Sequence, residues 1–212
     1  MLQYKTGQRF STFQNESQRF NDFQPKVNTI SQHTIAVIVG SLRHDSFNSK
    51  LASALSKLAP PEFLFVQSKI GDLPFYNQDD DAQQSEPLKR LKAEITAAKG
   101  LLFVTPEYNR TIPGVLKNAL DHASRPYGQS AWAVKPAGII GVSVGAISTA
   151  MAQQHLRNVL AYLDVPDLGQ PEAFIQAKDG LFDGDGNIGM ENKSFLQGWM
   201  NHYIAWIKHY AQ

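Results

Sequence analysis

Apolar runs alternate with amphipathic segments between residues 34 and 210. Residues 35–39 are a continuous run of apolar, mostly β-branched side chains, which is typical of a strand that is buried on both faces. In residues 48–58, leucine and alanine recur at the three- and four-residue spacing of a helix, and Pro60 and Pro61 end it. The alternation predicts five strands, at residues 35–39, 63–66, 101–105, 137–143 and 172–176, and five helices, at residues 48–58, 87–99, 113–123, 146–163 and 190–210.

Strands and helices that alternate through short connections predict an α/β fold with a doubly wound parallel sheet. No internal repeat or linker interrupts the pattern, so residues 34–212 are predicted to form one domain. Ligands of such sheets bind at the carboxyl ends of the strands. We therefore expect the loops after the first, third and fourth strands, at residues 41–48, 106–112 and 143–147, to meet at one edge of the sheet.

The first 33 residues have a different composition. Gln, Asn, Ser and Thr dominate this stretch, and its four phenylalanines follow no steady period. It lacks the apolar segment of a secretory signal, and the acidic residues Glu16 and Asp22 argue against a transit peptide. Residues 1–33 are therefore predicted to be an N-terminal extension, which is either flexible or docks on a partner subunit.

Composition and charge narrow the classes of function. Hydrophobic residues make up 42% of the chain and charged residues 18%, which is typical of a globular domain. A net charge of +1 provides no overall field for nucleic acid or an anionic membrane surface. The absence of cysteine excludes disulfides and thiolate catalysis. No apolar run approaches the roughly 20 residues of a membrane span. We expect a cytoplasmic protein without a nucleic-acid or membrane partner.

The loop after the first strand carries an unusual set of hydrogen-bond donors. Gly40 ends the strand, and Ser41, Arg43, Ser46 and Asn48 lead into the helix. A helix N-terminus offers unpaired backbone N–H groups and the positive end of the helix dipole, so it favours an anion such as phosphate. The loop lacks the Gly-Lys-Ser/Thr of a Walker A motif and the three glycines of a dinucleotide site, so it suits the phosphate of a mononucleotide. The alternative is that Ser46 and Asn48 only cap the helix.

The loop after the third strand is stiffened at both ends by Pro106 and Pro113. Such a loop can direct backbone N–H and C=O groups at the edge of a flat heterocycle, and Tyr108 can supply an aromatic wall beside the ring. The alternative is a proline-rich connector in which Thr111 caps the next helix. Because the loop after the first strand suits the phosphate of a mononucleotide, we favour the interpretation that this second loop binds the ring of the same ligand.

These two loops resemble the NADPH-dependent FMN reductase family, which comprises flavodoxin-like quinone, chromate and azo reductases. The resemblance rests on Gly40-Ser-Leu-Arg-x-x-Ser-x-Asn48 and on Pro106-Glu-Tyr-Asn109, which is continued by Ile112-Pro-Gly-Val-Leu-Lys-Asn-Ala-Leu-Asp121 and Ala123-Ser-Arg-Pro126. It covers residues 34–210 in order and at the spacing of the family.

The resemblance implies a five-stranded, flavodoxin-like sheet with strand order 2-1-3-4-5 and an FMN cofactor. It implies that the phosphate is held by Ser41, Arg43, Ser46, Phe47 and Asn48, that Pro106, Glu107, Tyr108 and Asn109 surround the ring and ribityl chain, and that Ser143 and Gly145 contact the isoalloxazine. The loop that carries this last pair, Ser143-Val-Gly-Ala146, matches the family more loosely. His122 stands where the family often has Trp, and Arg110 stands where an uncharged or aromatic residue is common.

The expected activity is that of an FMN-dependent NAD(P)H oxidoreductase. NADPH or NADH is the co-substrate, and a small molecule takes the electrons: a quinone, an azo compound, a metal oxyanion or free flavin. The flavin carries this chemistry, so no catalytic residue is assigned. The oligomers of the family imply a homodimer or homotetramer, with Arg125 and Tyr127 as candidate interface residues.

A flavodoxin-type electron carrier, which binds FMN without reacting with NAD(P)H, is the alternative. Carriers that dock on basic partners are strongly acidic, whereas this chain has a net charge of +1. A hydrolase with Ser41 as nucleophile needs a Gly-x-Ser-x-Gly elbow, which the chain lacks. Asp183-Gly-Asp-Gly-Asn187 imitates the start of a calcium loop, but Ile188 and Ser194 occupy the positions of its Gly and Glu, so no metal site is predicted.

Overall fold

The computed structural model of the protein describes residues 32–210. The predicted N-terminal extension lies outside the described residues, apart from Gln32 and His33. The first strand begins at His33, so the last residue of that predicted extension belongs to the sheet.

Five parallel strands form one sheet in the described part of the chain. They are β1 (His33–Val39), β2 (Phe63–Ser68), β3 (Gly100–Val104), β4 (Ala137–Ser143) and β5 (Phe174–Gln176). Their order is β2-β1-β3-β4-β5, and every neighbouring pair is parallel, so both the predicted fold class and the predicted strand order are confirmed. Strand β2 lies on one side of β1, and β3 lies on the other side. The strand order therefore reverses between β1 and β3, and ligands of such sheets bind at this point.

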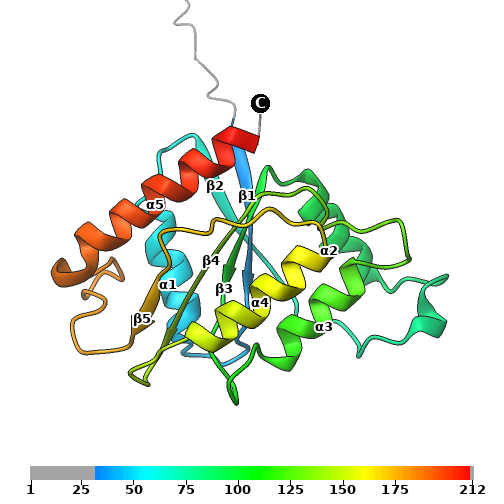
Figure 1. The fold of residues 1–212 in the computed structure, drawn as a ribbon, viewed down its shortest axis with the longest axis horizontal. Helices are drawn as coiled ribbons and strands as arrows, with labels where there is room; N and C mark the ends of the chain where they lie inside the picture. The colour runs from blue at the N-terminus through cyan, green and yellow to red at the C-terminus, as the bar shows by residue number, and fades with distance from the viewer. Residues whose placement is uncertain (1–31, 211–212) are drawn as a thin grey trace, which may run out of the picture. The chain divides into compact units, whose positions relative to one another are not determined.

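Helices cover both faces of the sheet (Figure 1). Helices α1 (Phe47–Ser56) and α5 (Met190–Tyr210) pack on one face, α2 (Glu86–Ala97), α3 (Gly114–Ala123) and α4 (Ala150–Tyr162) pack on the other, and the short 3-10 helix η1 (Gln78–Asp80) precedes α2. Within residues 32–210, no helix combines the length and the hydrophobicity that crossing a membrane requires.

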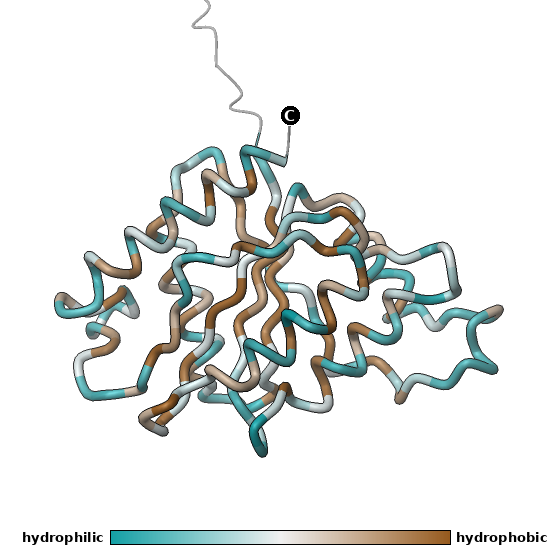
Figure 2. Tube along the Cα trace, viewed as in Figure 1, coloured by the Kyte–Doolittle hydropathy of each residue, from teal (hydrophilic) through white to brown (hydrophobic). Residues whose placement is uncertain are grey.

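Strand β1 carries apolar side chains on both faces of the sheet, so helices must bury both faces. Ile35, Val37 and Val39 join the core beneath α1 and α5, whereas Ala36 and Ile38 join the core beneath α2, α3 and α4. Figure 2 shows the strands as the most continuously hydrophobic part of the trace, while the helices alternate between hydrophobic and hydrophilic residues. The uninterrupted apolar run that predicted this strand therefore reflects burial on both sides.

The helix predicted at residues 146–163 is shorter than expected, because α4 begins only at Ala150. The residues before it form a tight turn, in which the Ser148 N–H donates to the Gly145 carbonyl at 2.9 Å. Ser148 has a φ of 53°, and its hydroxyl donates to the carbonyl of Ile175 in β5. Small and apolar residues in this turn continue the helical pattern, which is why the pattern placed the start of the helix too early.

The carboxyl ends of β1, β3 and β4 pack closely together. A Cβ on Gly141 would overlap the carbonyl oxygen of Thr105, and a Cβ on Gly40 would lie 2.6 Å from the Thr105 hydroxyl. Glycine at both positions lets the strand ends approach the residue that follows β3. The loops after these three strands consequently lie together at the lower edge of the sheet in Figure 1, as the sequence predicted.

Candidate functional site

The turn between β1 and α1 is closed by the cap of the helix. Ser46 is the N-cap residue, and its hydroxyl accepts hydrogen bonds from the N–H groups of Asn48 at 3.2 Å and Ser49 at 3.3 Å. The capping role that the sequence offered as an alternative is therefore present for Ser46. By capping the helix, the buried Ser46 side chain fixes the N-terminus of α1 at the edge of the sheet.

Asn48 joins the same turn to β4. Its side-chain Nδ2 donates to the Val142 carbonyl at 2.9 Å, and its Oδ1 accepts from the Val142 N–H at 3.0 Å. The residue is only 3% exposed. Because both ends of the amide are paired with protein backbone, the structure gives the Asn48 side chain a positioning role beneath the turn.

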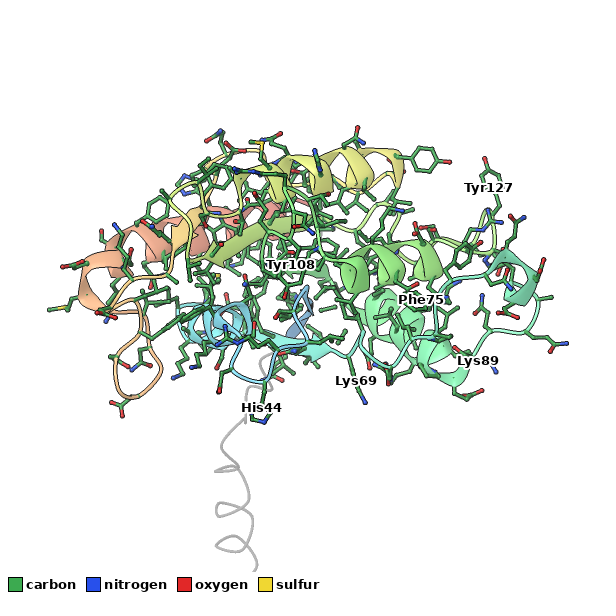
Figure 3. All side chains as sticks on the ribbon, turned by 90° about the horizontal axis from the view of Figure 1, so that it is seen from below. His44, Lys69, Phe75, Lys89, Tyr108 and Tyr127 are labelled. Carbon is green, nitrogen blue, oxygen red and sulfur yellow. The ribbon has the colours of Figure 1, made fainter. Side chains whose placement is uncertain are left out.

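Ser41, which is half-buried, and Arg43, which is exposed, supply side-chain donors of the turn. The Arg43 guanidinium lies 5.7 Å from the centre of the Phe47 ring, which is a cation–π distance. The Ser41 hydroxyl accepts from the Arg43 N–H at 3.4 Å. His44 and Asp45 extend into solvent, and Figure 3 shows His44 at the outer edge. A hydroxyl, a guanidinium and a helix N-terminus together form the donor set of a phosphate site.

The loop after β3 folds back in a tight turn. Backbone hydrogen bonds join Tyr108 and Thr111 in both directions, at 3.0 and 3.1 Å. Asn109 and Arg110 between them have φ angles of 51° and 67°, which define a type I′ turn. Pro106 is buried below the turn, whereas Tyr108 is half exposed, and Figure 3 shows Tyr108 near the middle of the molecule when it is seen from the lower edge.

Glu107 fastens this loop to α4. Its Oε2 accepts from the N–H groups of Met151 at 3.0 Å and Ala152 at 3.1 Å, in the first turn of the helix. Its Oε1 lies 3.6 Å from Nη1 of Arg110, and only 8% of the Glu107 side chain is exposed. The carboxylate therefore offsets the positive end of the α4 dipole. It also holds the loop after β3 against α4, the helix that follows the loop after β4.

The loop after β4 presents open backbone and apolar side chains. A Cβ on Gly145 would meet no atom within 4 Å, so a flat ligand can approach the backbone at this position. Val144 and Ile147 on either side are 71% and 54% exposed. Ser143 ends the strand, and its carbonyl accepts from the Ala177 N–H at 2.8 Å, which fixes the base of the loop on the segment after β5.

Cavities adjoin two of the predicted loops. One of about 360 Å³ lies beside Ser41 and is also lined by Leu42 and Ile70. The other, of about 520 Å³, lies beside the Tyr108 turn and is also lined by His155 from α4. The first cavity therefore lies beside the donors of the β1–α1 turn, and the second is bordered by the Tyr108 turn, α3 and α4.

Comparison with known proteins identifies the family. A sequence model described as NADPH-dependent FMN reductase matches residues 33–179. The chain is also 55% identical over 175 residues to the 2-hydroxy-1,4-benzoquinone reductase of Burkholderia sp, which covers 82% of this chain and 96% of that protein. The chain belongs to the NADPH-dependent FMN reductase family.

Two further relatives agree with membership of the FMN reductase family. A quinone reductase of Pseudomonas putida is 46% identical over 177 residues, which are 83% of this chain and 95% of that protein. The structure of FerB, a flavoenzyme NAD(P)H:(acceptor) oxidoreductase from Paracoccus denitrificans, matches with a TM-score of 0.81 at 45% identity over 84% of this chain and 98% of FerB. The predictions of the family, of an oxidoreductase, and of FMN with NAD(P)H as co-substrate are confirmed.

The residues present fit the FMN of this family. The donor set at the first turn suits the phosphate, and the open backbone at Gly145 leaves room for a flat ring. The structure places Ser41, Arg43, Ser46, Phe47 and Asn48 in one turn, and Pro106, Glu107, Tyr108, Asn109, Ser143 and Gly145 in two loops at the same edge of the sheet. Ser46, Asn48 and Glu107 use their side chains for contacts within the protein, and the individual contacts to FMN remain predictions.

The segment after β2 adds contacts that the sequence did not predict. Asn118 in α3 donates to the Pro74 carbonyl at 2.8 Å and accepts from the Tyr76 N–H at 2.9 Å. One turn further along α3, the His122 Nε2 lies 2.8 Å from the same carbonyl, and its ring meets the ring of Tyr76 edge to face. The four-residue spacing of Asn118 and His122 was a signal of one helix face, but their partner could not be read from the pattern.

The two candidate interface residues differ in their surroundings. Arg125 pairs within the chain, because its Nη2 lies 3.0 Å from Oδ2 of Asp81. Tyr127 is 86% exposed, and Figure 3 shows it projecting from the molecule. Tyr127 therefore has an accessible side chain, whereas the charge of Arg125 is already balanced.

Proposed function

We propose that this protein is an FMN-dependent NAD(P)H:quinone oxidoreductase. The observation that carries the proposal is the meeting of three loops at the carboxyl edge of the sheet, with phosphate donors on one and an aromatic turn on another, in a chain of the FMN reductase family. The quinone as acceptor is supported by relatives named quinone reductases at 55% and 46% identity.

We infer that Ser41, Arg43 and the N-terminus of α1 hold the FMN phosphate, and that the backbone around Tyr108 and Gly145 borders the ring. Bound there, FMN would supply the redox chemistry, with NAD(P)H as the hydride donor and the quinone as the acceptor of two electrons. In sum, NAD(P)H, a quinone and one proton give NAD(P)⁺ and a hydroquinone. Solvent supplies the proton, so the side chains of the site bind and orient the reactants without forming a catalytic acid–base pair.

A flat apolar acceptor suits the exposed surface of the site. Tyr108, Val144, Ile147 and Met151 are between 41% and 71% exposed and belong to the loops that meet there or to the first turn of α4. Such a surface gains free energy from covering an aromatic ring but little from a hydrated metal oxyanion. Azo compounds, metal oxyanions and free flavin are the other acceptors to be compared with quinones.

Absorbance measurements on the purified protein test the cofactor and the reaction together. We expect a yellow protein whose flavin band bleaches rapidly on anaerobic mixing with NADPH or NADH and recovers when a quinone is added. A flavin that stays oxidised with both nucleotides would favour the electron carrier instead. A protein that binds no FMN would overturn the proposal.

The phosphate assignment is tested by Arg43→Ala. The change removes a charged donor, and charge-assisted hydrogen bonds contribute about 1.5 to 3 kcal/mol, so we expect the Kd for FMN to rise by roughly 10- to 100-fold. Fluorescence titration of the apoprotein with FMN measures it. Lys193→Ala removes an exposed cation on α5 and is expected to leave the Kd unchanged. Full flavin retention by Arg43→Ala would show that the phosphate binds elsewhere.

We further propose a cytoplasmic homodimer or homotetramer. The supporting observations are the absence of cysteine and the exposed aromatic rings of Tyr127 and Tyr162, which are 86% and 85% accessible in the single chain. Light scattering coupled to gel filtration measures the mass of the assembly. A monomer at micromolar concentration would contradict this proposal.

A further inference from the structure

The Asn109-Arg110 turn has a sequence that its backbone does not favour. A type I′ turn requires a positive φ at both central residues, and Asn-Gly is the preferred pair. Here the second position, with a φ of 67°, holds an arginine. Asn tolerates this left-handed conformation, whereas a long side chain is strained in it relative to glycine. A strained position occupied by arginine points to a role for the side chain itself.

The guanidinium of Arg110 is only loosely paired. Its contact with Glu107 is 3.6 Å long, and 68% of the Arg110 side chain is exposed. The Glu107 carboxylate is already bound by two N–H groups of α4, so it does not depend on the arginine. Within residues 32–210 this ion pair is the one polar contact of the guanidinium, which leaves most of its five N–H donors free.

Arg110 also stands beside the exposed apolar surface of the site. Tyr108 belongs to the same turn, and Met151 donates its N–H to the carboxylate that pairs with Arg110. Arg110 is therefore joined to two exposed apolar residues, to Tyr108 through the turn and to Met151 through the Glu107 carboxylate. Lys117 of α3, which lines the same cavity as Tyr108, is bound at 2.8 Å to both oxygens of Asp121, so its charge is balanced. One available cation beside an apolar wall complements a flat ring that carries a negative charge.

We propose that Arg110 makes this enzyme selective for quinones that carry an anionic group on the ring, hydroxyquinones above all. The proposal rests on the quinone reductase function proposed above. A hydroxyl on a quinone ring is a vinylogous carboxylic acid and is ionised at neutral pH. Its oxygen and the adjacent carbonyl present two acceptors in the ring plane, to which a planar guanidinium donates two parallel hydrogen bonds. Arg110 thus determines specificity and takes no part in the transfer of the hydride.

The test compares two quinones of similar size on the FMN-loaded enzyme. 2-Hydroxy-1,4-naphthoquinone is anionic and 2-methyl-1,4-naphthoquinone is neutral, and NADH serves as donor so that no 2′-phosphate is present. Arg110→Gly, which also relieves the backbone strain, is expected to lower kcat/KM for the hydroxyquinone by about 10-fold or more relative to the methylquinone. Arg110→Lys keeps the charge but not the planar fork, so it is expected to lose part of the preference.

Two controls and a binding measurement complete the test. Lys89→Ala removes an exposed cation on α2, which Figure 3 shows far from Tyr108, and is expected to leave the ratio of the two quinones unchanged. Raising the ionic strength is expected to reduce the preference of the wild type. The Kd values of both quinones for the oxidised enzyme, from the perturbation of the flavin spectrum without NADH, are expected to change in the same way as kcat/KM.

Several results would overturn the proposal. Equal losses for both quinones, or an unchanged ratio in Arg110→Gly, would show that the side chain does not select the anion. If Arg110→Gly lowers kcat/KM with NADPH as donor but not with NADH, Arg110 binds the 2′-phosphate of NADPH instead of the quinone. Wild-type enzyme that oxidises NADH but reduces neither quinone would overturn the quinone reductase function itself, and this failure is visible before any variant is made.

Discussion

Asn48 is a single side chain that holds two loops of the site together. Its amide pairs with both the N–H and the C=O of Val142 in the interior of the protein. Asn48→Ala is expected to lower the free energy of unfolding by about 2 to 4 kcal/mol, because two buried backbone groups lose their partner. Urea denaturation with FMN in excess measures the change.

The matched control for Asn48 is Asn158→Ala on the exposed side of α4. We expect it to change the free energy of unfolding by no more than about 0.5 kcal/mol. Equal stability of the two variants would contradict the positioning role of Asn48.

The same residue shows how far single positions could be interpreted from the sequence. Ser41, Arg43, Ser46 and Asn48 predicted a phosphate loop by their types and spacing. The partner of Asn48 lies 94 residues further along the chain, and no local pattern contains that contact. Sequence therefore predicted which residues gather at the turn, but the structure was needed to separate those that face outward from those that support it.

At the scale of an element, α4 depends on a side chain from another segment for its first turn. Thr149, the N-cap residue of α4, makes no capping hydrogen bond with its side chain, and the Glu107 carboxylate accepts from the N–H groups of Met151 and Ala152 instead. Glu107→Ala is expected to cost about 1 to 2 kcal/mol of stability, and Glu107→Gln less, because the amide oxygen still accepts while the charge is lost. Urea denaturation with excess FMN measures both variants.

Glu191→Ala is the control for Glu107, since Glu191 is an exposed acid in the first turn of α5. Its loss is expected to cost no more than about 0.5 kcal/mol. If Glu107→Ala costs no more than this control, the carboxylate does not stabilise the start of α4.

Regular elements were more predictable than the segments between them. The strand at residues 137–143 and the helix at 190–210 have the predicted bounds, because continuous and periodic apolar patterns report burial directly. The start of α4 was predicted four residues too early, because the small and apolar residues before it continue the helical pattern and the side chain that caps the helix comes from a distant loop. The type I′ turn was not predicted at all, since it uses Asn-Arg where the pattern for such turns is Asn-Gly.

At the scale of the whole domain, α5 covers one face of the sheet because glycines make room for it. A Cβ on Gly138 would lie 2.5 Å from the ring of Tyr203, and a Cβ on Gly100 would overlap Ile207. The alternation of strands and helices predicted the parallel sheet, and the family resemblance predicted its order. Neither predicted this close approach, because the fit between a strand glycine and a distant aromatic ring is a property of the packed domain.

Tyr203 makes the packing of α5 measurable through pH. Its side chain is fully buried, and its hydroxyl donates to the Leu101 carbonyl of β3 at 2.9 Å. Burial raises the pKa of Tyr203 well above its usual value of about 10. Above about pH 10, Tyr203 loses its proton in the unfolded chain but keeps it in the folded protein. The free energy of unfolding therefore falls as the pH rises, by up to about 1.4 kcal/mol per pH unit from this group.

Tyr203→Phe removes both the hydrogen bond and the titration. Near neutral pH we expect the variant to be less stable than the wild type by about 1 kcal/mol, since the Leu101 carbonyl loses its donor. Between about pH 9 and pH 11 this difference is expected to shrink and then reverse, because only the wild type pays the cost of keeping Tyr203 protonated. Urea denaturation across this range measures it, with Tyr162→Phe as the control, because the Tyr162 ring is 85% exposed. A Tyr203→Phe difference that stays constant over the range would show that Tyr203 does not remain protonated beneath α5.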